Sequence, residues 1–370
     1  RQLLRDAVGH PARARRTATA DPVGICPSAG TAHHPTSGSR DLPCTSRDVA
    51  GTEPAAGTGP AAEQRVALTM GTATVTRLEQ RAMGVACSVT VVGDNGFDLA
   101  RRALERVTHL EHLWSRFISN SDVSRLNCSS GANVFVDPLT VHLLEVMKAA
   151  HTATNGIFDP TRLDAQVAAG DAESRDGSGL TVLPAGPHSH DLADIEIVDD
   201  FCVRMHHGIT VDAGGIGKGL AADLVATEII RAGASGVCVN LGGDMRCAGT
   251  PPDSHGWTVG ISSPFDYDRT IATVRILDGA VATSSTSARS IKGKFTASHI
   301  MDPSTGLPSQ VATVGATVIA SSAAWAEAFT KVAILHPRGV DTAAAHGLAC
   351  MTVDENGTVE TNALWGDFAS

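Results

Sequence analysis

Residues 211–219 read VDAGGIGKG, and this stretch decides how the middle of the chain folds. It places four glycines in the eight residues after Val211, and a helix from about Gly217 to Ala232 follows them. Glycine lets the backbone turn tightly and approach a ligand, so we predict a strand at 210–212, a turn and then the helix. The unpaired N–H groups of the helix N-terminus and the charge of Lys218 suit a phosphate. A packing turn without a ligand is an equal alternative, because the spacing matches neither nucleotide-binding fingerprint.

Strands and helices surround this stretch in an irregular order. The predicted strands are 85–92, 236–241, 257–262, 271–277, 280–283 and 311–320, with a hairpin within 195–207. The predicted helices are 97–117, 138–154 and 323–335, and residues 170–190 are expected to form a surface loop. Because no regular strand–helix–strand period is present, we predict an α+β fold with mixed sheets flanked by helices.

The N-terminal part of the chain differs in composition from the rest. Residues 1–60 contain no Phe, Trp, Tyr or Met and seven Leu, Ile or Val, too few to offset the entropy lost on folding. We therefore predict that residues 1–65 are disordered or a non-native extension, with the natural start near Val66 or Met70. The folded domain is expected to span residues 72–360.

Charge and hydropathy restrict the partners of the protein. The net charge of -10 argues against nucleic-acid binding, which needs basic surface. No apolar run approaches the roughly 20 residues that span a bilayer, and no signal peptide or lipid-attachment cysteine is recognisable. These features predict a cytoplasmic protein without an integral membrane segment. The eight cysteines form no C-x-x-C pair, which argues against a zinc site or a dense disulfide framework.

Four further segments carry residues that suit chemistry. They are NLGGD at 240–244, HIMDPSTG at 299–306, GIFDPT at 156–161 and AEAFTK at 326–331. His299 is a candidate base, a ligand contact or a structural hydrogen-bonding residue. Glu327 and Thr330 lie three residues apart on one helix face and would suit Mg²⁺, whereas a solvated face with a Glu327–Lys331 pair is the alternative. Each segment taken alone is weak.

Together, and in this order, the segments resemble the ApbE family of FAD:protein FMN transferases. The resemblance covers about Met83 to Leu335, including WSRF at 114–117 and SDVSRLN at 121–127. It implies the ApbE-like, T-fold-related architecture. It also implies a Mg²⁺-dependent enzyme that cleaves FAD, attaches FMN by a phosphoester to a Thr or Ser of an acceptor protein, and releases AMP. Alternatives are an FAD-binding module without catalysis and an FAD pyrophosphatase without protein transfer.

The resemblance also assigns roles to individual residues. It implies that FAD is held by Met83, Phe117, Ile157, Phe158, Asp159, Asp212, Lys218 and Ile300. It implies His299 as the base, with Lys218 at the phosphates, and Gly215, Glu327 and Thr330 as Mg²⁺ ligands. The sequence departs from the family on the last helix, where Lys331 follows Thr330. The Lys331 ammonium in the place of the cation is therefore an alternative to Mg²⁺.

Overall fold

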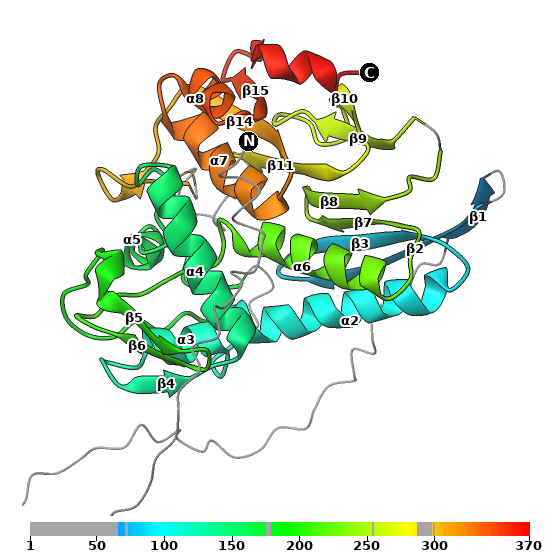
Figure 1. The fold of residues 1–370 in the computed structure, drawn as a ribbon. Coiled ribbons are helices and arrows are strands. Elements are labelled where there is room, and N and C mark those ends of the chain that lie inside the picture. Colours follow the sequence, from blue (N-terminus) through cyan, green and yellow to red (C-terminus); the bar gives the residue numbers. More distant parts are fainter. Residues whose placement is uncertain (1–65, 71–72, 175–178, 254, 287–297, 299) are drawn as a thin grey trace, which may run out of the picture. The chain divides into compact units, whose positions relative to one another are not determined.

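The computed structural model describes residues 66–70, 73–174, 179–253, 255–286, 298 and 300–370 (Figure 1). Within this part of the chain the largest element is a nine-stranded sheet in the order β1-β2-β3-β7-β8-β11-β14-β15-β16. Every neighbouring pair is antiparallel. The strands are β1 Val66–Met70, β2 Ala73–Ala82, β3 Val85–Val92, β7 Gly236–Leu241, β8 Asp244–Gly249, β11 Gly279–Ser285, β14 Thr313–Ala320, β15 Ala349–Asp354 and β16 Val359–Thr361.

Four helices pack along this sheet and beside one another. They are α2 Gly96–Trp114, α6 Gly217–Arg231, α7 Ala323–Leu335 and α8 Gly339–Ala345. Helix α2 contacts β2 and β3, α6 contacts β7 and β8, and α7 contacts β11 and β14 (Figure 1). The apolar residues of α2 recur at three- and four-residue steps, and this stripe is buried against the strands.

A hairpin of β9 (Trp257–Ser262) and β10 (Thr270–Ile276) covers other side chains of the sheet. The residues of β9 alternate between buried and exposed, as expected for a strand with one covered face. Trp257, Val259 and Ile261 form a core cluster with side chains from β11, β14 and β15, and no residue of α2, α6 or α7 belongs to it. The hairpin therefore covers the face opposite to these helices.

The remaining elements form a smaller layer beside α2 and α7. A three-stranded antiparallel sheet has the order β4-β6-β5, and a two-stranded ladder joins β12 and β13. These elements are α3 Asp122–Asn127, β4 Asn133–Phe135, α4 Pro138–Ala153, α5 Leu163–Ala168, η1 Leu192–Asp194, β5 Ile195–Asp199, β6 Cys202–Met205, β12 Met301–Asp302 and β13 Leu307–Pro308. The short helix η2 Ala363–Asp367 lies elsewhere, in contact with β15, and its Trp365 belongs to the core cluster of the hairpin.

The α+β architecture predicted from the sequence is confirmed, and two local predictions are wrong. The helix predicted at 97–117 ends at Trp114, where the backbone of Ser115 becomes extended. The next residue, Arg116, has a buried side chain that donates hydrogen bonds to Asp171. Residues 210–212 form no strand. The side-chain amide of Asn127 accepts from Val211 N at 2.8 Å and donates to Val211 O at 2.9 Å, so it replaces a strand partner.

Three further expectations concern the N-terminal region, a membrane segment and the predicted surface loop. The predicted N-terminal extension at 1–65 lies outside the described residues. No helix in the described part combines the length and apolar character that a membrane crossing requires. The loop predicted at 170–190 is not wholly a surface segment, because the Asp171 carboxylate contacts the buried Arg116 at 2.8 Å.

Candidate active site

The N-termini of α6 and α7 meet at a position that only glycine can occupy. A Cβ added to Gly219 would lie 2.3 Å from the carbonyl oxygen of Ala323 and 2.6 Å from the nitrogen of Ala324. Both atoms belong to the backbone and cannot move without displacing α7. The glycine-rich stretch 214–219 therefore lets the two helices approach closely, and this brings side chains of α7 to the beginning of α6.

Each of the two helices supplies a carboxylate that caps the other. Glu327 on α7 is 1% exposed, and its Oε2 accepts a hydrogen bond of 2.8 Å from the N–H of Gly219 in the first turn of α6. Asp223 on α6 accepts from Ala323 N at 2.9 Å and from Ala324 N at 3.0 Å in the first turn of α7. Both carboxylates satisfy N–H groups that have no partner within their own helix. Burial raises the pKa of Asp223, although these N–H groups oppose the shift.

Lys218 lies between two buried carboxylates. Its Nζ is 2.9 Å from Asp244 Oδ2 and donates to Glu327 Oε1. Burial alone would lower the pKa of Lys218, but the charges of Asp244 and Glu327 raise it above its ordinary value. Lys218 is therefore a permanent cation.

Asp244 has an environment that disfavours its charge. Burial, followed by repulsion from Glu327, raises its pKa to about 6, while Lys218 and Lys331 partly offset the shift. Its Oδ2 contacts Lys218, and its Oδ1 has no hydrogen-bond partner among the described residues. A buried unpaired carboxylate oxygen costs free energy and is typical of functional sites.

Lys331 and Thr330 complete this cluster from α7. Lys331 Nζ donates to the main-chain oxygen of Glu327 at 3.0 Å and lies 3.9 Å from Glu327 Oε1. Thr330 is fully buried, donates to the Glu327 carbonyl at 2.6 Å, and its hydroxyl lies 2.7 Å from Ser284 Oγ. The predicted solvated face with a Glu327–Lys331 surface pair is wrong, because the tight crossing of α6 and α7 buries the carboxylate.

The described residues do not fit the predicted Mg²⁺ site. One oxygen of Glu327 is bound by the Lys218 ammonium and the other by the N–H of Gly219. A second ammonium, that of Lys331, lies close to the same carboxylate. No group of three or more His, Cys, Asp or Glu able to hold a metal is present in the part of the chain that the structure describes. Two ammonium groups beside one carboxylate would repel a divalent cation placed next to them.

A large cavity of about 660 Å³ opens on the α2 side of the cluster. Its walls include Met83, Phe117, Asp212 and Lys218, four of the residues that the resemblance assigns to FAD. Met83 stands in the β2–β3 turn with a positive φ of 51°, which turns the chain sharply between the two strands. The volume lies within the usual range of about 300–1,000 Å³ for ligand pockets.

Arg116 organises the wall of this cavity. It is 4% exposed, its Nη2 lies 2.8 Å from Asp171 Oδ2, and its Nε lies 3.3 Å from Asp212 Oδ1. Its Cζ lies 4.2 Å from the centroid of the Phe117 ring, a cation–π contact. Arg116 therefore contacts both Asp212 and the aromatic ring, although the sequence predicted no role for it.

A second, smaller cavity of about 70 Å³ adjoins the first at Asp212 and Gly214. The other predicted residues that line it are Ile157, Phe158, Asp159, Gly215 and Ile300, and Lys331 contributes to the same wall. A Cβ on Gly215 would lie 3.0 Å from the Phe158 ring and 3.5 Å from Lys331 Cε. The absence of a side chain at Gly215 therefore keeps the ring and the lysine stem close to the turn.

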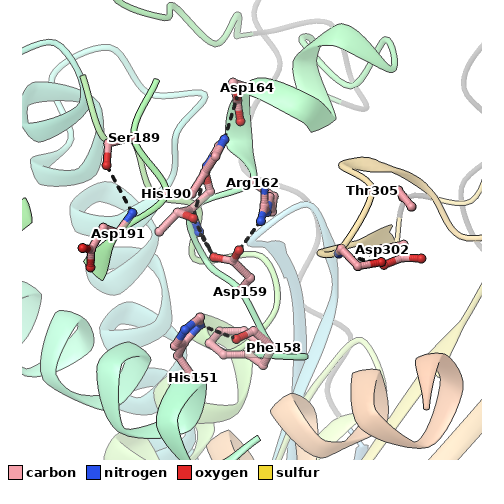
Figure 2. A network of polar contacts seen from close by, with 12 residues as sticks. His151, Phe158, Asp159, Arg162, Asp164, Ser189, His190, Asp191, Asp302 and Thr305 are labelled. Carbon is pink, nitrogen blue, oxygen red and sulfur yellow. Dashed lines mark hydrogen bonds and ion pairs between the residues drawn. The ribbon is translucent and has the colours of Figure 1, made fainter. Parts of the chain in front are cut away.

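The segment that carries Phe158 and Asp159 is held by a polar network (Figure 2). His151 Nδ1 lies 3.0 Å from the carbonyl oxygen of Phe158, and Arg162 Nε donates to Asp159 Oδ2 at 2.8 Å. Asp159 Oδ1 also accepts from the N–H of Thr161 at 2.9 Å and from its hydroxyl at 2.6 Å. Figure 2 shows the Asp159 carboxylate facing Arg162, with His190 nearby. Both oxygens of Asp159 therefore accept hydrogen bonds from the protein, which fix the side chain in the cavity wall.

The structure thus brings the predicted FAD residues together around two adjoining cavities, with Glu327 and Thr330 buried behind the turn. His299 lies outside the described residues, and its predicted role stays a prediction. Three residues were missed as members of the site: Arg116, Asp171 and Asp244. Arg116 stands inside the quoted WSRF segment and Asp244 ends the quoted NLGGD segment, so both had a local signal. Asp171 had none, because its contact with Arg116 spans 55 residues.

Comparison with known proteins shows the relatives of this chain. A sequence model of the ApbE family matches residues 83–352. The chain is 32% identical over 152 residues to the FAD:protein FMN transferase of Escherichia coli K12, a match that covers 40% of this chain and 43% of that protein. It is 26% identical over 266 residues to the FAD:protein FMN transferase of Salmonella typhimurium, covering 66% of this chain and 74% of that protein. The chain thus spans less than half of the E. coli relative in that match.

Solved structures share the fold. The ApbE protein from Thermotoga maritima superposes with a TM-score of 0.70 at 24% identity, covering 83% of this chain and 100% of that chain. The flavin transferase ApbE from Vibrio cholerae gives a TM-score of 0.66 at 21% identity, covering 80% and 99%. The matched residues include the charged cluster and every residue that lines the two cavities except Arg81 and Ala82. The chain belongs to the ApbE family.

Proposed function

We propose that the protein is an FAD:protein FMN transferase. It takes FAD as substrate, attaches FMN to a Ser or Thr hydroxyl of an acceptor protein, and releases AMP. The observation that carries the proposal is the meeting of two cavities at Asp212 and Gly214, with a lysine on the wall of each. A dinucleotide needs a cavity of ligand size and positive charge at its pyrophosphate, and the larger cavity of about 660 Å³ with the two lysines offers both.

The proposed reaction is a phosphoryl-type displacement. The hydroxyl oxygen of the acceptor forms a bond to the phosphorus of the FMN half, and the bond from that phosphorus to the bridging oxygen breaks. AMP leaves with the bridging oxygen, and the hydroxyl proton passes to a base, for which His299 is the candidate. Lys218 carries a permanent positive charge that stabilises negative charge developing on the phosphates.

Incubation with FAD and an acceptor protein that contains a flavinylation Ser or Thr tests the proposal. We expect a fluorescent acceptor band, an acceptor mass increased by one FMN less water, and one equivalent of AMP on chromatography. Free FMN and AMP without labelled acceptor would instead identify an FAD pyrophosphatase. FAD binding with no cleavage in either assay would identify a binding module and contradict the proposal.

His299→Ala separates binding from transfer. We expect this variant to lose acceptor labelling by at least about a hundredfold, the usual contribution of a general base, while its affinity for FAD is retained. His142→Ala is a suitable control, since His142 is on α4 and is not among the residues that line either cavity. Unchanged labelling by the His299 variant would remove His299 from the mechanism.

A further inference from the structure

Each oxygen of the Glu327 carboxylate already accepts a bond from the protein. Oε1 is bound by the Lys218 ammonium, and Oε2 accepts the N–H of Gly219 at 2.8 Å. Both donors are fixed by the first turn of α6, and the carboxylate is 1% exposed. A divalent ion at this place would have to break the Lys218 pair and leave that ammonium without one of its two carboxylate partners.

Lys331 lies where its charge can reach the ligand cavity. It is one turn after Glu327 on α7, its Nζ donates to the Glu327 carbonyl at 3.0 Å, and it lies 3.5 Å from Ser284 Oγ. The lysine lines the smaller cavity together with Asp212 and Gly215. Its side chain is 16% exposed, so the ammonium is held in place by the protein yet accessible from the cavity.

Lys218 has the matching position on the other side of the turn. It lines the larger cavity, and its side chain is 20% exposed. The two ammonium groups approach the same oxygen of Glu327 from α6 and from α7. A pyrophosphate lying across the junction of the cavities at Gly214 would therefore face one lysine from each side. Lysine offers three N–H donors and a compact charge, which suits phosphate oxygens.

We propose that Lys218 and Lys331 together replace a divalent cation at the phosphates, so that this protein binds FAD without Mg²⁺. The inference rests on the proposed function, because it names how the same site neutralises its substrate. It differs from the Mg²⁺ dependence that the family resemblance implies, and the occupied oxygens of Glu327 are the reason.

Titration of the full chain with FAD, followed by quenching of flavin fluorescence, tests the inference without any transfer step. We expect dissociation constants that agree within twofold in EDTA and in millimolar MgCl₂. Binding at least tenfold tighter with Mg²⁺ would overturn the inference and leave the proposed function intact. The absence of FAD binding under both conditions would overturn the proposed function, and the inference with it.

Substitutions of Lys331 give a second, independent test. Lys331→Met retains the apolar stem and removes the charge, and we expect FAD binding to weaken about tenfold in EDTA. Lys331→Arg keeps the charge and is expected to restore most of the affinity. Lys148→Met is the matched control, because Lys148 bonds the carbonyl of Ile195 and lines neither cavity. Equal affinities of the Met variant and the wild type would overturn the role of Lys331.

Lys331→Asp reverses the charge and shows whether the position can host a metal. It places a second carboxylate one helical turn from Glu327, and we expect one equivalent of Mn²⁺ to bind, as measured by electron paramagnetic resonance. The wild type is expected to bind Mn²⁺ at least tenfold more weakly. Stoichiometric Mn²⁺ binding by the wild type that is lost in Glu327→Gln would identify a metal site and overturn the inference. Circular dichroism and thermal unfolding confirm that each variant is folded.

Discussion

Helices α6 and α7 cap each other with carboxylates, and the two caps have different surroundings. At the N-terminus of α7, Asp223 accepts from Ser322 Oγ, Ala323 N and Ala324 N at 2.8–3.0 Å, and Arg246 Nε lies 3.5 Å away. At the N-terminus of α6, Glu327 accepts a hydrogen bond from the N–H of Gly219, and its carboxylate also forms ion pairs with Lys218 and Lys331. The lysines line the ligand cavities.

The comparison shows that a carboxylate at a helix N-terminus can serve stability alone or can also position charged side chains at a cavity. The Asp223 cap binds the N–H groups of Ala323 and Ala324, and Asp223 lines neither of the two cavities. The Glu327 cap fixes the position of two ammonium groups on the walls of the ligand cavities. Substitutions at the first cap should therefore change stability, whereas substitutions at the second should change stability and FAD binding together.

Glu327→Ala should have the largest effect. It leaves Asp244 as the only carboxylate partner of Lys218 among the described residues and removes the acceptor of the Gly219 N–H. Breaking a buried charge pair of this kind costs about 3–5 kcal/mol of folding free energy. We expect the free energy of unfolding in urea to fall by this amount and FAD affinity to fall at least tenfold. Glu228→Ala is the control, since its pair with Arg106 is a third exposed and is worth about 1 kcal/mol or less. A Glu327 variant as stable as the control would contradict the buried role of the cap.

Asp223→Ala should affect stability only. It removes three hydrogen bonds at the beginning of α7, and bonds to a charged acceptor contribute about 1.5–3 kcal/mol when lost with a helix cap. We expect urea unfolding to show a loss of about 2–3 kcal/mol, with FAD affinity changed less than twofold. A tenfold loss of FAD affinity in a folded Asp223 variant would abolish the distinction between the two caps.

The pH dependence of stability should reveal Asp244. Its pKa in the folded protein is about 6 against an ordinary value of 3.8, so between these values the folded state holds a proton that the unfolded chain has released. Stability from this group is therefore present at low pH and is lost as pH rises to 6. Relative to Asp244→Asn, the wild type should lose about 2 kcal/mol between pH 4 and 7, since one pKa unit corresponds to about 1.4 kcal/mol. Parallel stability curves for the two proteins would contradict the raised pKa.

Phe117→Ala should have the smallest effect of these substitutions. Phe117 belongs to neither the Asp223 cap nor the Glu327 cap. The ring lines the larger cavity and contacts Arg116, so its loss should weaken FAD binding about tenfold, or about 1.4 kcal/mol. We expect little change in unfolding, because Phe117 is only half-buried. Phe265→Ala is a control, because this ring is 58% exposed and lines neither of the two cavities. Equal FAD affinities in both variants would place the flavin or adenine elsewhere.

Much of the fold follows from local pattern. The strands at 85–92, 236–241 and 257–262 and the helix at 323–335 have the bounds that their periodicity predicts. The wrong predictions occur where a side chain far away in the sequence determines the backbone conformation. The amide of Asn127 holds residue 211 across 84 positions, and Asp171 draws Arg116 out of the predicted helix. No local pattern contains such partners.

The sequence by itself determined the α+β class, the family, and which segments surround the ligand cavities. It did so because the alternation of apolar and polar residues, the helical spacing of apolar residues and the glycine turns are local properties. Several motifs that follow one another in a fixed order also identify a family. Only the tertiary structure decided the state of Glu327 and Lys331. Their spacing of four residues is compatible with a surface ion pair, a metal ligand beside a lysine, or a buried cap. The close crossing of α6 over α7 at Gly219 buries the carboxylate, and burial then requires partners for both of its oxygens.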